Sequence, residues 1–415
     1  MKRDILLRVL LACGAVLLTI LVLEIAVRAL GETDADGQFT FLDYTLPPHV
    51  LPLNQLRPQL EHYHENRDRT IFIPDPATGW TYRPKARFYD GLFKINSASM
   101  RSLREHAPEP AADSLRIALF GDSFTVGNEV KSDEVWGYHL EKLLMEAGIN
   151  AEVLNFGVSG YDMGQAFLRW QTQGKDYSPD IVIAGFQPEN LDRNVNVFRL
   201  LYLQGGIVYS KPRFILDGDS LALINSPALP PDEIMDVFEA FDSHPLAAYE
   251  AYYRGRDVSS PLWKASRLAG LAYAVLNQPN RVMPPQQTYG PDSERGKLGK
   301  AIIDAFAEDA AESRVTFIVL HLPRRERLKD YHDNKGQPYQ FLLDHFQEAY
   351  HFINAEEFLG LEYTNDSYYQ PNGHYGPEIN MKIAEAVAAD LLACIENGSC
   401  ALPRFQDITQ IQQKD

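Results

Sequence analysis

Cysteine and positive charge are scarce in this chain of 415 residues. Its three cysteines and its histidines show no spacing typical of a zinc site. Acidic residues outnumber basic ones by 56 to 39, which gives a net charge of −17 and argues against nucleic acid as a partner. The sequence also has no glycine-rich phosphate loop and no internal repeat. Nothing in it implies a metal ion or an organic cofactor.

One long hydrophobic run is present, at the N-terminus. The run Ile5–Val27 is interrupted only by Arg8 and Glu24. As a helix it would extend roughly 34 Å, enough to cross the hydrocarbon core of a bilayer. Basic residues precede the run and acidic residues follow it, so we expect a single-pass anchor in the cytoplasmic (inner) membrane, with the N-terminus in the cytoplasm and the rest in the periplasm. A signal peptide cleaved near residues 29–31 is the alternative, and it also exports the chain.

The composition along the chain predicts four segments. They are a transmembrane anchor at 1–30, an extended arm at 31–112 that packs on the main domain, a main domain at 113–400 and a polar tail at 401–415. An insertion at about 195–300 interrupts the main domain and holds short extended pieces at 206–209, 212–216 and 221–224. This insertion either caps the site, which we favour, or decorates the edge of the sheet.

Apolar strands alternate with helices through the main domain. The patterns predict strands at 116–120, 152–155, 180–186 and 314–320, and helices at 134–147, 163–173 and 380–392. Because the strands are continuously apolar, we expect helices on both faces of the sheet. The predicted fold class is three-layer α/β/α with a mostly parallel central sheet. In such a sheet, sites form at the carboxyl ends of the strands.

A serine follows the first of these strands. Gly121-Asp122-Ser123 ends the apolar run, and a sharp turn from strand to helix would expose the Ser123 hydroxyl. Backbone N–H groups at the start of the helix would lie beside it, as acyl transfer requires. We expect Asp122 to hold this turn through local hydrogen bonds.

Four sequence blocks together resemble the SGNH/GDSL hydrolase family. They are Gly121–Phe124, Asn155–Tyr161 and Gly185–Asn190, each after a predicted strand, and Asn372–Tyr375, just before the last helix. The resemblance covers roughly residues 115–395. The arm, with Ile95-Asn96-Ser97 and Met100-Arg101-Ser102, is similar to that of membrane-anchored bacterial members. The resemblance implies an SGNH-type esterase.

The resemblance also implies roles for single residues. Ser123 matches the nucleophile, and His374 matches the base that takes its proton. The backbone N–H groups of Ser123 and Gly157 match two donors of the oxyanion hole, and the side-chain amide of Asn190 would be the third. The family's asparagine usually stands where this chain has Gln187, so Gln187 is the alternative donor. Asn190 would then cap the helix that follows.

The acid of a catalytic triad is missing from its usual place. The family usually has an aspartate three residues before the histidine, where this chain has Pro371. Asp366 is the nearest preceding acid. Either Asp366 reaches His374, or the site is a Ser–His dyad in which a backbone carbonyl orients the imidazole.

Three further features keep two interpretations each. His321 ends a strand and either lines the site or is satisfied by local hydrogen bonds. The basic cluster Arg324–Arg327 is either a solvated helix start or a binding site for an anionic glycan or lipid headgroup. Cys394 and Cys400 either form a disulfide or stay free thiols.

The family resemblance implies a serine-dependent acyl-ester hydrolase. Its substrates would be acyl (acetyl) esters of envelope glycans or lipids, cleaved through a Ser123 acyl-enzyme without a cofactor. An O-acyltransferase that uses the same acyl-enzyme is a second hypothesis. A non-catalytic, membrane-tethered glycan-binding protein is a third.

Overall fold

The computed structural model describes residues 2–35, 37–51, 53–203, 207–218, 220–277, 285–400 and 402. The chain forms two compact units. We call Met1–Glu61 with Asp232–Pro284 the N-terminal unit, and His62–Pro231 with Pro285–Asp415 the sheet unit. The segment boundaries and the capping role expected above stay predictions. Apart from Leu402, the expected polar tail lies outside the described residues, as does Gly206 of the first extended piece.

The N-terminal unit begins with the long helix α1 (Lys2–Leu30). Its stretch Arg3–Leu30 is long and apolar enough to cross a membrane. A small antiparallel sheet follows, in which Phe39 and Leu46 pack on Val27 at the end of α1. The strands of this unit are β1 (Glu32–Thr33), β2 (Phe39–Phe41) and β3 (Tyr44–Leu46). Its further helices are α2 (Leu53–Asn66), α8 (Pro231–Glu239), η3 (Phe241–Ser243), η4 (Pro245–Tyr249), α9 (Gly255–Ser259), α10 (Pro261–Ala265) and α11 (Arg267–Leu276), and α2 and α8 cross its boundaries.

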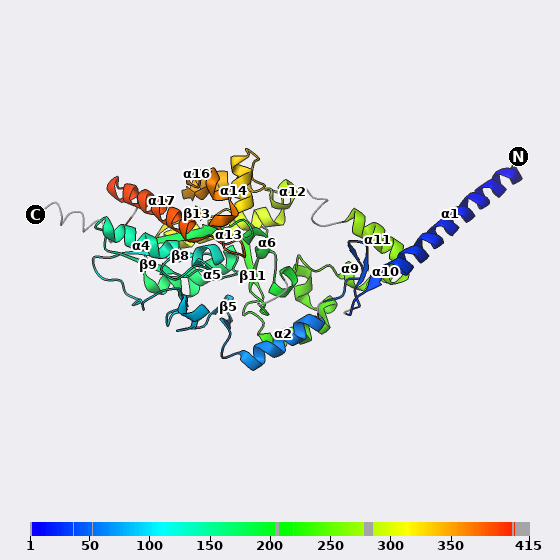
Figure 1. Ribbon diagram of the computed structural model, residues 1–415, viewed down its shortest axis with the longest axis horizontal. Helices are drawn as coiled ribbons and strands as arrows, with labels where there is room; N and C mark the ends of the chain where they lie inside the picture. Colours follow the sequence, from blue (N-terminus) through cyan, green and yellow to red (C-terminus); the bar gives the residue numbers. More distant parts are fainter. Residues whose placement is uncertain are drawn as a thin grey trace, which may run out of the picture. The chain divides into compact units, whose positions relative to one another are not determined.

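Five parallel strands form the centre of the sheet unit, in the order β14-β13-β10-β8-β9, and Figure 1 labels β8, β9 and β13 among them. They are β8 (Leu115–Phe120), β9 (Ala151–Asn155), β10 (Ile181–Phe186), β13 (Thr316–His321) and β14 (His351–Asn354). Every residue of β8 and β10 is buried, as expected for strands covered on both faces. The four predicted strands are confirmed to within two residues at each end.

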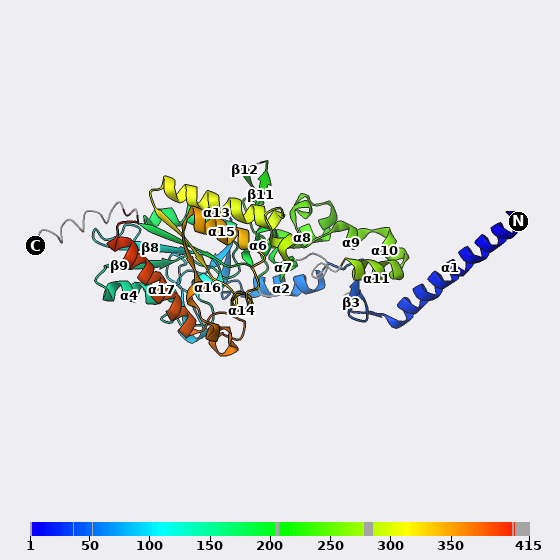
Figure 2. The same cartoon turned by 90° about the horizontal axis from the view of Figure 1, so that it is seen from above.

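Helices cover both faces of this sheet (Figure 2). On one face α4 and α17 pack against each other and on the odd-numbered residues of β8. On the other face the ring of Phe120 contacts Trp170 of α5 and Phe306 of α13. The three-layer α/β/α fold is therefore confirmed. The covering helices are α4 (Trp136–Glu146), α5 (Met163–Thr172), α13 (Glu294–Glu312), α15 (Gln340–Ala349) and α17 (Pro377–Glu396).

Shorter elements complete the sheet unit. Residues 62–112 contribute two antiparallel pairs, and Trp80 and Tyr82 in the first pair are fully buried. Two of the expected extended pieces of the insertion, 212–216 and 221–224, form the pair β11-β12. The bounds of these strands are β4 (Phe72–Asp75), β5 (Gly79–Tyr82), β6 (Arg87–Phe88), β7 (Phe93–Lys94), β11 (Arg213–Asp217) and β12 (Ser220–Ile224). The short helices are η1 (Tyr89–Gly91), α3 (Ser123–Val126), η2 (Gly174–Tyr177), α6 (Asn190–Asn194), α7 (Arg199–Tyr202), α12 (Pro285–Tyr289), α14 (Arg325–His332), α16 (Ala355–Phe358), η5 (Leu361–Thr364) and η6 (Asp366–Tyr368).

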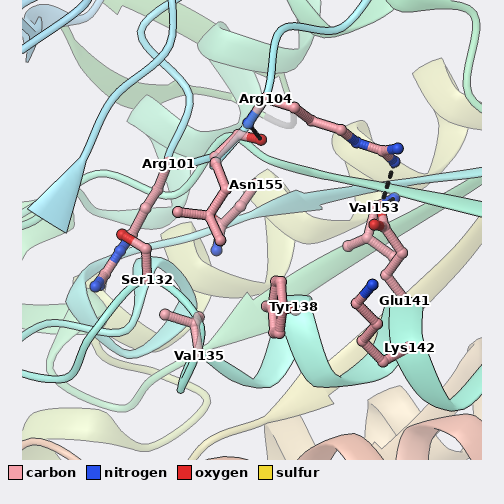
Figure 3. Close-up of a pocket in the computed structure, with 12 residues that line it drawn as sticks. Arg101, Arg104, Ser132, Val135, Tyr138, Glu141, Lys142, Val153 and Asn155 are labelled. Carbon is pink, nitrogen blue, oxygen red and sulfur yellow. Dashed lines mark hydrogen bonds and ion pairs between the residues drawn. The ribbon is translucent and has the colours of Figure 1, made fainter. Parts of the chain in front are cut away.

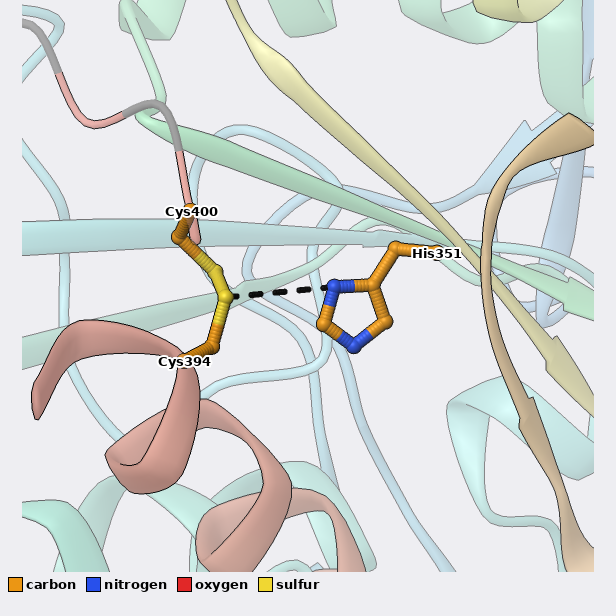
Figure 4. A group of neighbouring side chains, drawn as sticks. All are labelled: His351, Cys394 and Cys400. Atoms are coloured by element: carbon orange, nitrogen blue, oxygen red, sulfur yellow. Dashed lines mark hydrogen bonds between the residues drawn. A yellow bond between two sulfur atoms is a disulfide. The ribbon is translucent and has the colours of Figure 1, made fainter. Parts of the chain in front are cut away.

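Cys394 and Cys400 form a disulfide, which decides between the two alternatives for these cysteines (Figure 4). The bridge joins the end of α17 to the residues that follow it, and His351 of β14 lies beside it with Nδ1 3.9 Å from Cys394 Sγ. Within the described ranges, these three residues are the group whose ligand atoms lie close enough to share a metal ion. Sulfur atoms bonded to each other offer no thiolate to a metal.

Glu152 on the edge strand β9 joins β8 to the preceding arm. Its carboxylate accepts hydrogen bonds from Arg116 Nε and lies near His106 Nδ1, both at 2.7 Å. Burial alone would raise the pKa of Glu152, but the hydrogen bonds from His106 and Arg116 outweigh burial and lower the pKa to about 2.

We expect Glu152→Gln to destabilise the sheet unit by about 2 kcal/mol at pH 7, because the buried Arg116 loses its counter-charge. The folded Glu152 carboxyl stays ionised down to a pKa of about 2, whereas the unfolded one takes up a proton near its ordinary value of 4.5. The wild type therefore loses this stabilisation as the pH falls from 4.5 toward 2. The difference in the free energy of unfolding between the wild type and the variant becomes smaller over this range. Urea unfolding followed by tryptophan fluorescence across this range measures the gap. Glu61→Gln, an exposed control, should show no such effect, and a pH-independent gap would contradict the account.

Candidate active site

Ser123 lies at the carboxyl edge of the central sheet, directly after β8. Gly121 turns the chain with a φ of +155°, and a Cβ there would lie 2.2 Å from Thr125 Oγ1, so the turn requires glycine. Asp122 is the N-cap of α3, and its Oδ1 accepts a hydrogen bond from the N–H of Phe124 at 2.9 Å. The expected role of Asp122 in holding the turn is confirmed.

The hydroxyl and the backbone N–H of Ser123 are both available to a substrate. The residue is 5% exposed, and within the part of the chain that the structure describes, neither its hydroxyl nor its backbone N–H has a recorded hydrogen-bond partner. A hydroxyl free to attack and an N–H free to receive negative charge are what acyl transfer needs at the nucleophile.

His374 is brought to the nucleophile by packing. Its ring centroid lies 5.3 Å from that of Phe124, the residue after Ser123. The neighbouring Tyr375 packs edge-on against the same ring at 4.8 Å and donates its hydroxyl to the carbonyl of Pro323 at 2.5 Å. The aromatic contacts of Phe124 therefore fix the histidine loop beside the serine turn.

Glu129 is the acidic partner of His374. Its Oε2 lies 2.5 Å from His374 Nδ1, and its Oε1 accepts a hydrogen bond from Asn372 Nδ2 at 2.7 Å. Because Nδ1 faces the carboxylate, Nε2 is the nitrogen left to take a proton from a serine hydroxyl. The contact between His374 and Glu129 is therefore the one that joins histidine and acid in a Ser–His–acid triad, while Ser123 and His374 are not hydrogen-bonded to each other in the described part of the chain.

The expectation that Asp366 serves His374 is not met. Asp366 is paired with Arg325, and its side chain is 85% exposed. Among the described residues no contact between Asp366 and His374 is recorded. The alternative, a dyad oriented by a backbone carbonyl, is not met either, because a carboxylate faces Nδ1. The overlooked signal was an acid six positions after the nucleophile, in the loop between α3 and α4.

Arg101 holds the loop that carries Glu129. Its guanidinium donates hydrogen bonds to the carbonyls of Val126, Gly127 and Val130, and it stacks 4.0 Å from the ring centroid of Phe93. Burial lowers the pKa of Arg101 to about 9. The Met100-Arg101-Ser102 motif therefore has a structural role: it clamps the loop that supplies the acid.

The side-chain amide of Asn190 is oriented by Arg193. Its Oδ1 accepts a hydrogen bond from Arg193 Nη1 at 3.2 Å, so the NH₂ group is the end left for a substrate. Arg193 also donates to Asp122 Oδ2 at 2.7 Å and to Glu189 Oε2 at 2.9 Å. The N-cap of α6 is Glu189, so Asn190 does not cap this helix.

The second backbone donor differs from the expectation. The N–H of Gly157 donates to Asn155 Oδ1 at 3.0 Å and is not free for an oxyanion. In the described part of this loop, the buried N–H of Gly160 has no recorded acceptor, which makes it the better candidate. Gln187 is buried, its Oε1 accepts from the N–H of Glu189 at 2.8 Å, and its Nε2 has no partner among the described residues.

His321 belongs to a buried polar cluster at the ends of β13 and β14. Its Nδ1 lies 2.8 Å from Asn354 Oδ1, and its Nε2 lies 3.4 Å from the hydroxyl of Tyr339. Burial lowers the pKa of His321 to about 4, and burial raises the pKa of the neighbouring Glu356 to about 7. His321 is thus satisfied locally, and no contact joins it to His374 in the described ranges.

Two cavities open around the basic cluster, in which Arg325 begins α14. Arg324 pairs with Glu189 at 2.6 Å. One cavity of about 340 Å³ is lined by Gln187, Pro188, Glu189, Asp192, Tyr289, Arg324, Glu326, Arg327, Pro338 and Tyr339. The other, of about 440 Å³, is lined by Arg324, Arg325, Glu326, Asp366, Tyr369, Gln370, Pro371 and Gly373. The second cavity therefore includes the residue next to His374.

A third cavity lies away from these residues. It measures about 230 Å³ and lies beside β9 and α4, where Arg104 pairs with Glu141 (Figure 3). Neither Ser123 nor His374 lines it. The Arg101 side chain passes it on the way to the nucleophile loop, so the cavity marks the junction of the arm with the sheet.

The three strand-end blocks lie at the carboxyl edge of the parallel sheet, and the block before α17 packs against the first of them through Phe124, as the resemblance described above leads us to expect. Among similar solved structures are the psychrotrophic esterase EstA from Pseudoalteromonas sp. (TM-score 0.36, 10% identity, covering 68% of this chain and 98% of that one) and a GDSL-like lipase from Bacteroides thetaiotaomicron VPI-5482 (0.32, 13%, 70% and 91%). A third is a two-domain esterase active on acetylated mannans (0.33, 11%, 68% and 49%). A scan of protein families and a search of curated proteins found no match. The roles of single residues rest on this chain's own geometry.

We expect Glu129→Gln to lower kcat for a simple acetyl ester by about 10²- to 10⁴-fold, because an amide favours the wrong imidazole tautomer and cannot stabilise the imidazolium. Asp366→Asn is the matched control and should stay near the wild-type rate. Steady-state hydrolysis of p-nitrophenyl acetate by the full-length protein in detergent measures both. A large loss of kcat in Asp366→Asn, with little change in Glu129→Gln, would instead assign the role of the acid to Asp366.

Proposed function

We propose that this chain is a serine-dependent acyl-ester hydrolase that acts outside the cytoplasmic membrane on short acyl esters, such as acetyl esters, of envelope saccharides. The observation that carries the proposal is the imidazole of His374, hydrogen-bonded to Glu129 and packed on Phe124, the residue after Ser123. A serine hydroxyl is a weak nucleophile without such a base, and the arrangement supplies one.

The chemistry follows from these positions. Ser123 Oγ attacks the acyl carbonyl while His374 Nε2 takes the hydroxyl proton, and Glu129 stays ionised and stabilises the imidazolium. The N–H of Ser123, the side-chain amide of Asn190 and the N–H of Gly160 hold the oxyanion. His374 returns the proton to the departing alcohol, which leaves an ester on Ser123. Water then attacks this ester with His374 as the base, releases the acid and restores the serine.

The two cavities beside the site support a saccharide over a long-chain lipid. Their walls carry carboxylates, guanidinium groups, amides, prolines and tyrosines, and among the described residues no leucine, isoleucine, valine, phenylalanine or methionine lines either one. A long acyl chain needs apolar walls, whereas sugar hydroxyls need donors and acceptors. Glu189, Asp192 and Arg324 line these walls as members of ion pairs, and the rings of Tyr289 and Tyr369 offer flat surfaces for a sugar.

Three features support a periplasmic location with a single membrane anchor. The helix α1 has the length and the apolar composition of a membrane span. Lys2, Arg3 and Arg8 lie at its start and Glu32 and Asp34 follow it, which favours a cytoplasmic N-terminus. The disulfide between Cys394 and Cys400 is typical of an oxidising compartment.

We expect the full-length protein in detergent to release acetate from peracetylated cellobiose, and to cleave p-nitrophenyl acetate with a kcat/KM at least about a hundredfold above that for p-nitrophenyl palmitate. The reason is that no aliphatic or phenylalanine side chain among the described residues lines either cavity, so a long alkyl chain finds few side chains to pack against. Chromatography of the released acid and steady-state kinetics measure these rates, and Ser123→Ala is the control that should lose both. A preference for palmitate would contradict the substrate assignment. Acetyl transfer to added cellobiose, in place of release as acetate, would make the protein an O-acyltransferase.

A further inference from the structure

The outer face of α11 is apolar. Ala272, Val275 and Leu276 share one side of this helix at positions i, i+3 and i+4, and Val275 and Leu276 are 47% and 69% exposed. Arg267 is the single charged residue between Arg267 and Leu276. The outer face of a helix in contact with water normally carries polar and charged residues, so the composition of this face indicates another environment.

The inner face of α11 is already occupied. Leu268 and Leu271 pack on the cluster that Val27 of α1 forms with Phe39 and Leu46. A Cβ on Gly270 would lie 3.2 Å from the carbonyl of Pro47, so the helix approaches the chain closely on this side. Within the described part of the N-terminal unit, the apolar side of α11 that remains uncovered is therefore the outer one.

Glu24 of α1 joins the start of α11 to the anchor helix. Its carboxylate accepts hydrogen bonds from the N–H groups of Arg267 at 2.9 Å and Leu268 at 2.8 Å, and from Ser266 Oγ at 2.8 Å. A negative charge is favourable at a helix N-terminus, where the first N–H groups lack partners within the helix. Both overall views place α11 beside the C-terminal end of α1 (Figures 1 and 2).

The position of Glu24 sets the depth of this contact. The apolar stretch Ile5–Leu23 is about 28 Å long as a helix, close to the thickness of about 30 Å of a hydrocarbon core. Glu24 then lies at the outer boundary of the core, and the start of α11 lies there with it. Arg28 and the exposed Lys264 fall at the same level, where basic side chains meet lipid headgroups.

We propose that the outer face of α11 lies in the outer lipid–water interface of the membrane that α1 spans, held there by Glu24. The inference rests on the proposed membrane anchoring. With about 15 Å of length, α11 is too short to span the bilayer, so it lies at the surface as an amphipathic helix does. The occupant of the apolar face is the phospholipid bilayer, and α1 and α11 together fix the N-terminal unit on it.

Site-directed spin labelling of the full chain in nanodiscs of phosphatidylethanolamine and phosphatidylglycerol tests this contact. Nitroxides are placed singly at Leu276→Cys or Val275→Cys in a Cys13→Ser background, since Cys394 and Cys400 are bonded. Collisions with oxygen report lipid, and collisions with a water-soluble nickel chelate report water. Leu17→Cys in α1 is the lipid control, and Glu61→Cys in α2 is the water control.

The expected result is high oxygen and low nickel accessibility at positions 275 and 276, with an oxygen-to-nickel ratio several-fold above that at position 61. Glu24→Ala, which removes the hydrogen bonds from Ser266, Arg267 and Leu268 together with the ion pair to Arg28, should raise nickel accessibility at position 276, whereas Glu32→Ala should not. High nickel accessibility at 275 and 276 with a lipid signal at 17 would overturn the inference and leave the anchor intact. Low accessibility to both reagents would assign the face to a protein contact instead. High nickel accessibility at position 17 would show that α1 does not cross the membrane, which would contradict the proposed anchor.

Discussion

The buried ion pair between Asp122 and Arg193 is the interaction on which the candidate site depends. Their side chains meet at 2.7 Å and both are buried, so removing Arg193 would leave the Asp122 carboxylate in the interior without this counter-charge. Asp122 also caps α3 and so places Ser123, while Arg193 turns the amide of Asn190. One pair therefore sets the nucleophile and an oxyanion donor relative to each other.

The acid of the proposed triad lies close to the proposed nucleophile in the sequence. Glu129 follows Ser123 in the same loop, and Arg101 of the preceding arm holds that loop through three carbonyl groups. His374 lies far along the sequence, just before the last helix, and its ring packs on that of Phe124. Asp122 thus places Ser123 and Arg101 holds the loop of Glu129, and the packing of His374 on Phe124 brings the histidine to them.

Continuous apolar runs predicted the four long strands. A strand covered on both faces is apolar along its whole length, and this pattern is visible without knowing which strands lie beside it. β14 was missed, since the four residues His351–Asn354 are too short and too polar to show one. Ser123, His374 and Asn190 could be chosen as candidates because each belongs to a turn or block of recognisable order, and their roles stay predictions. Glu129 could not, because its role depends on how the loop before α17 packs against the loop after α3. The prediction that the Gly157 N–H would bind the oxyanion was wrong for a similar reason, because this N–H donates to the side chain of Asn155, two residues earlier.

Reaction with a fluorophosphonate tests the central claim, that Ser123 is an activated nucleophile, most directly. The full-length protein in detergent would be labelled, weighed intact and mapped by peptide mass spectrometry, beside Ser123→Ala. The account predicts one adduct per chain, located on Ser123 and absent from the variant. Folded protein that takes up no label, or that takes it up at another residue in both proteins, would contradict it.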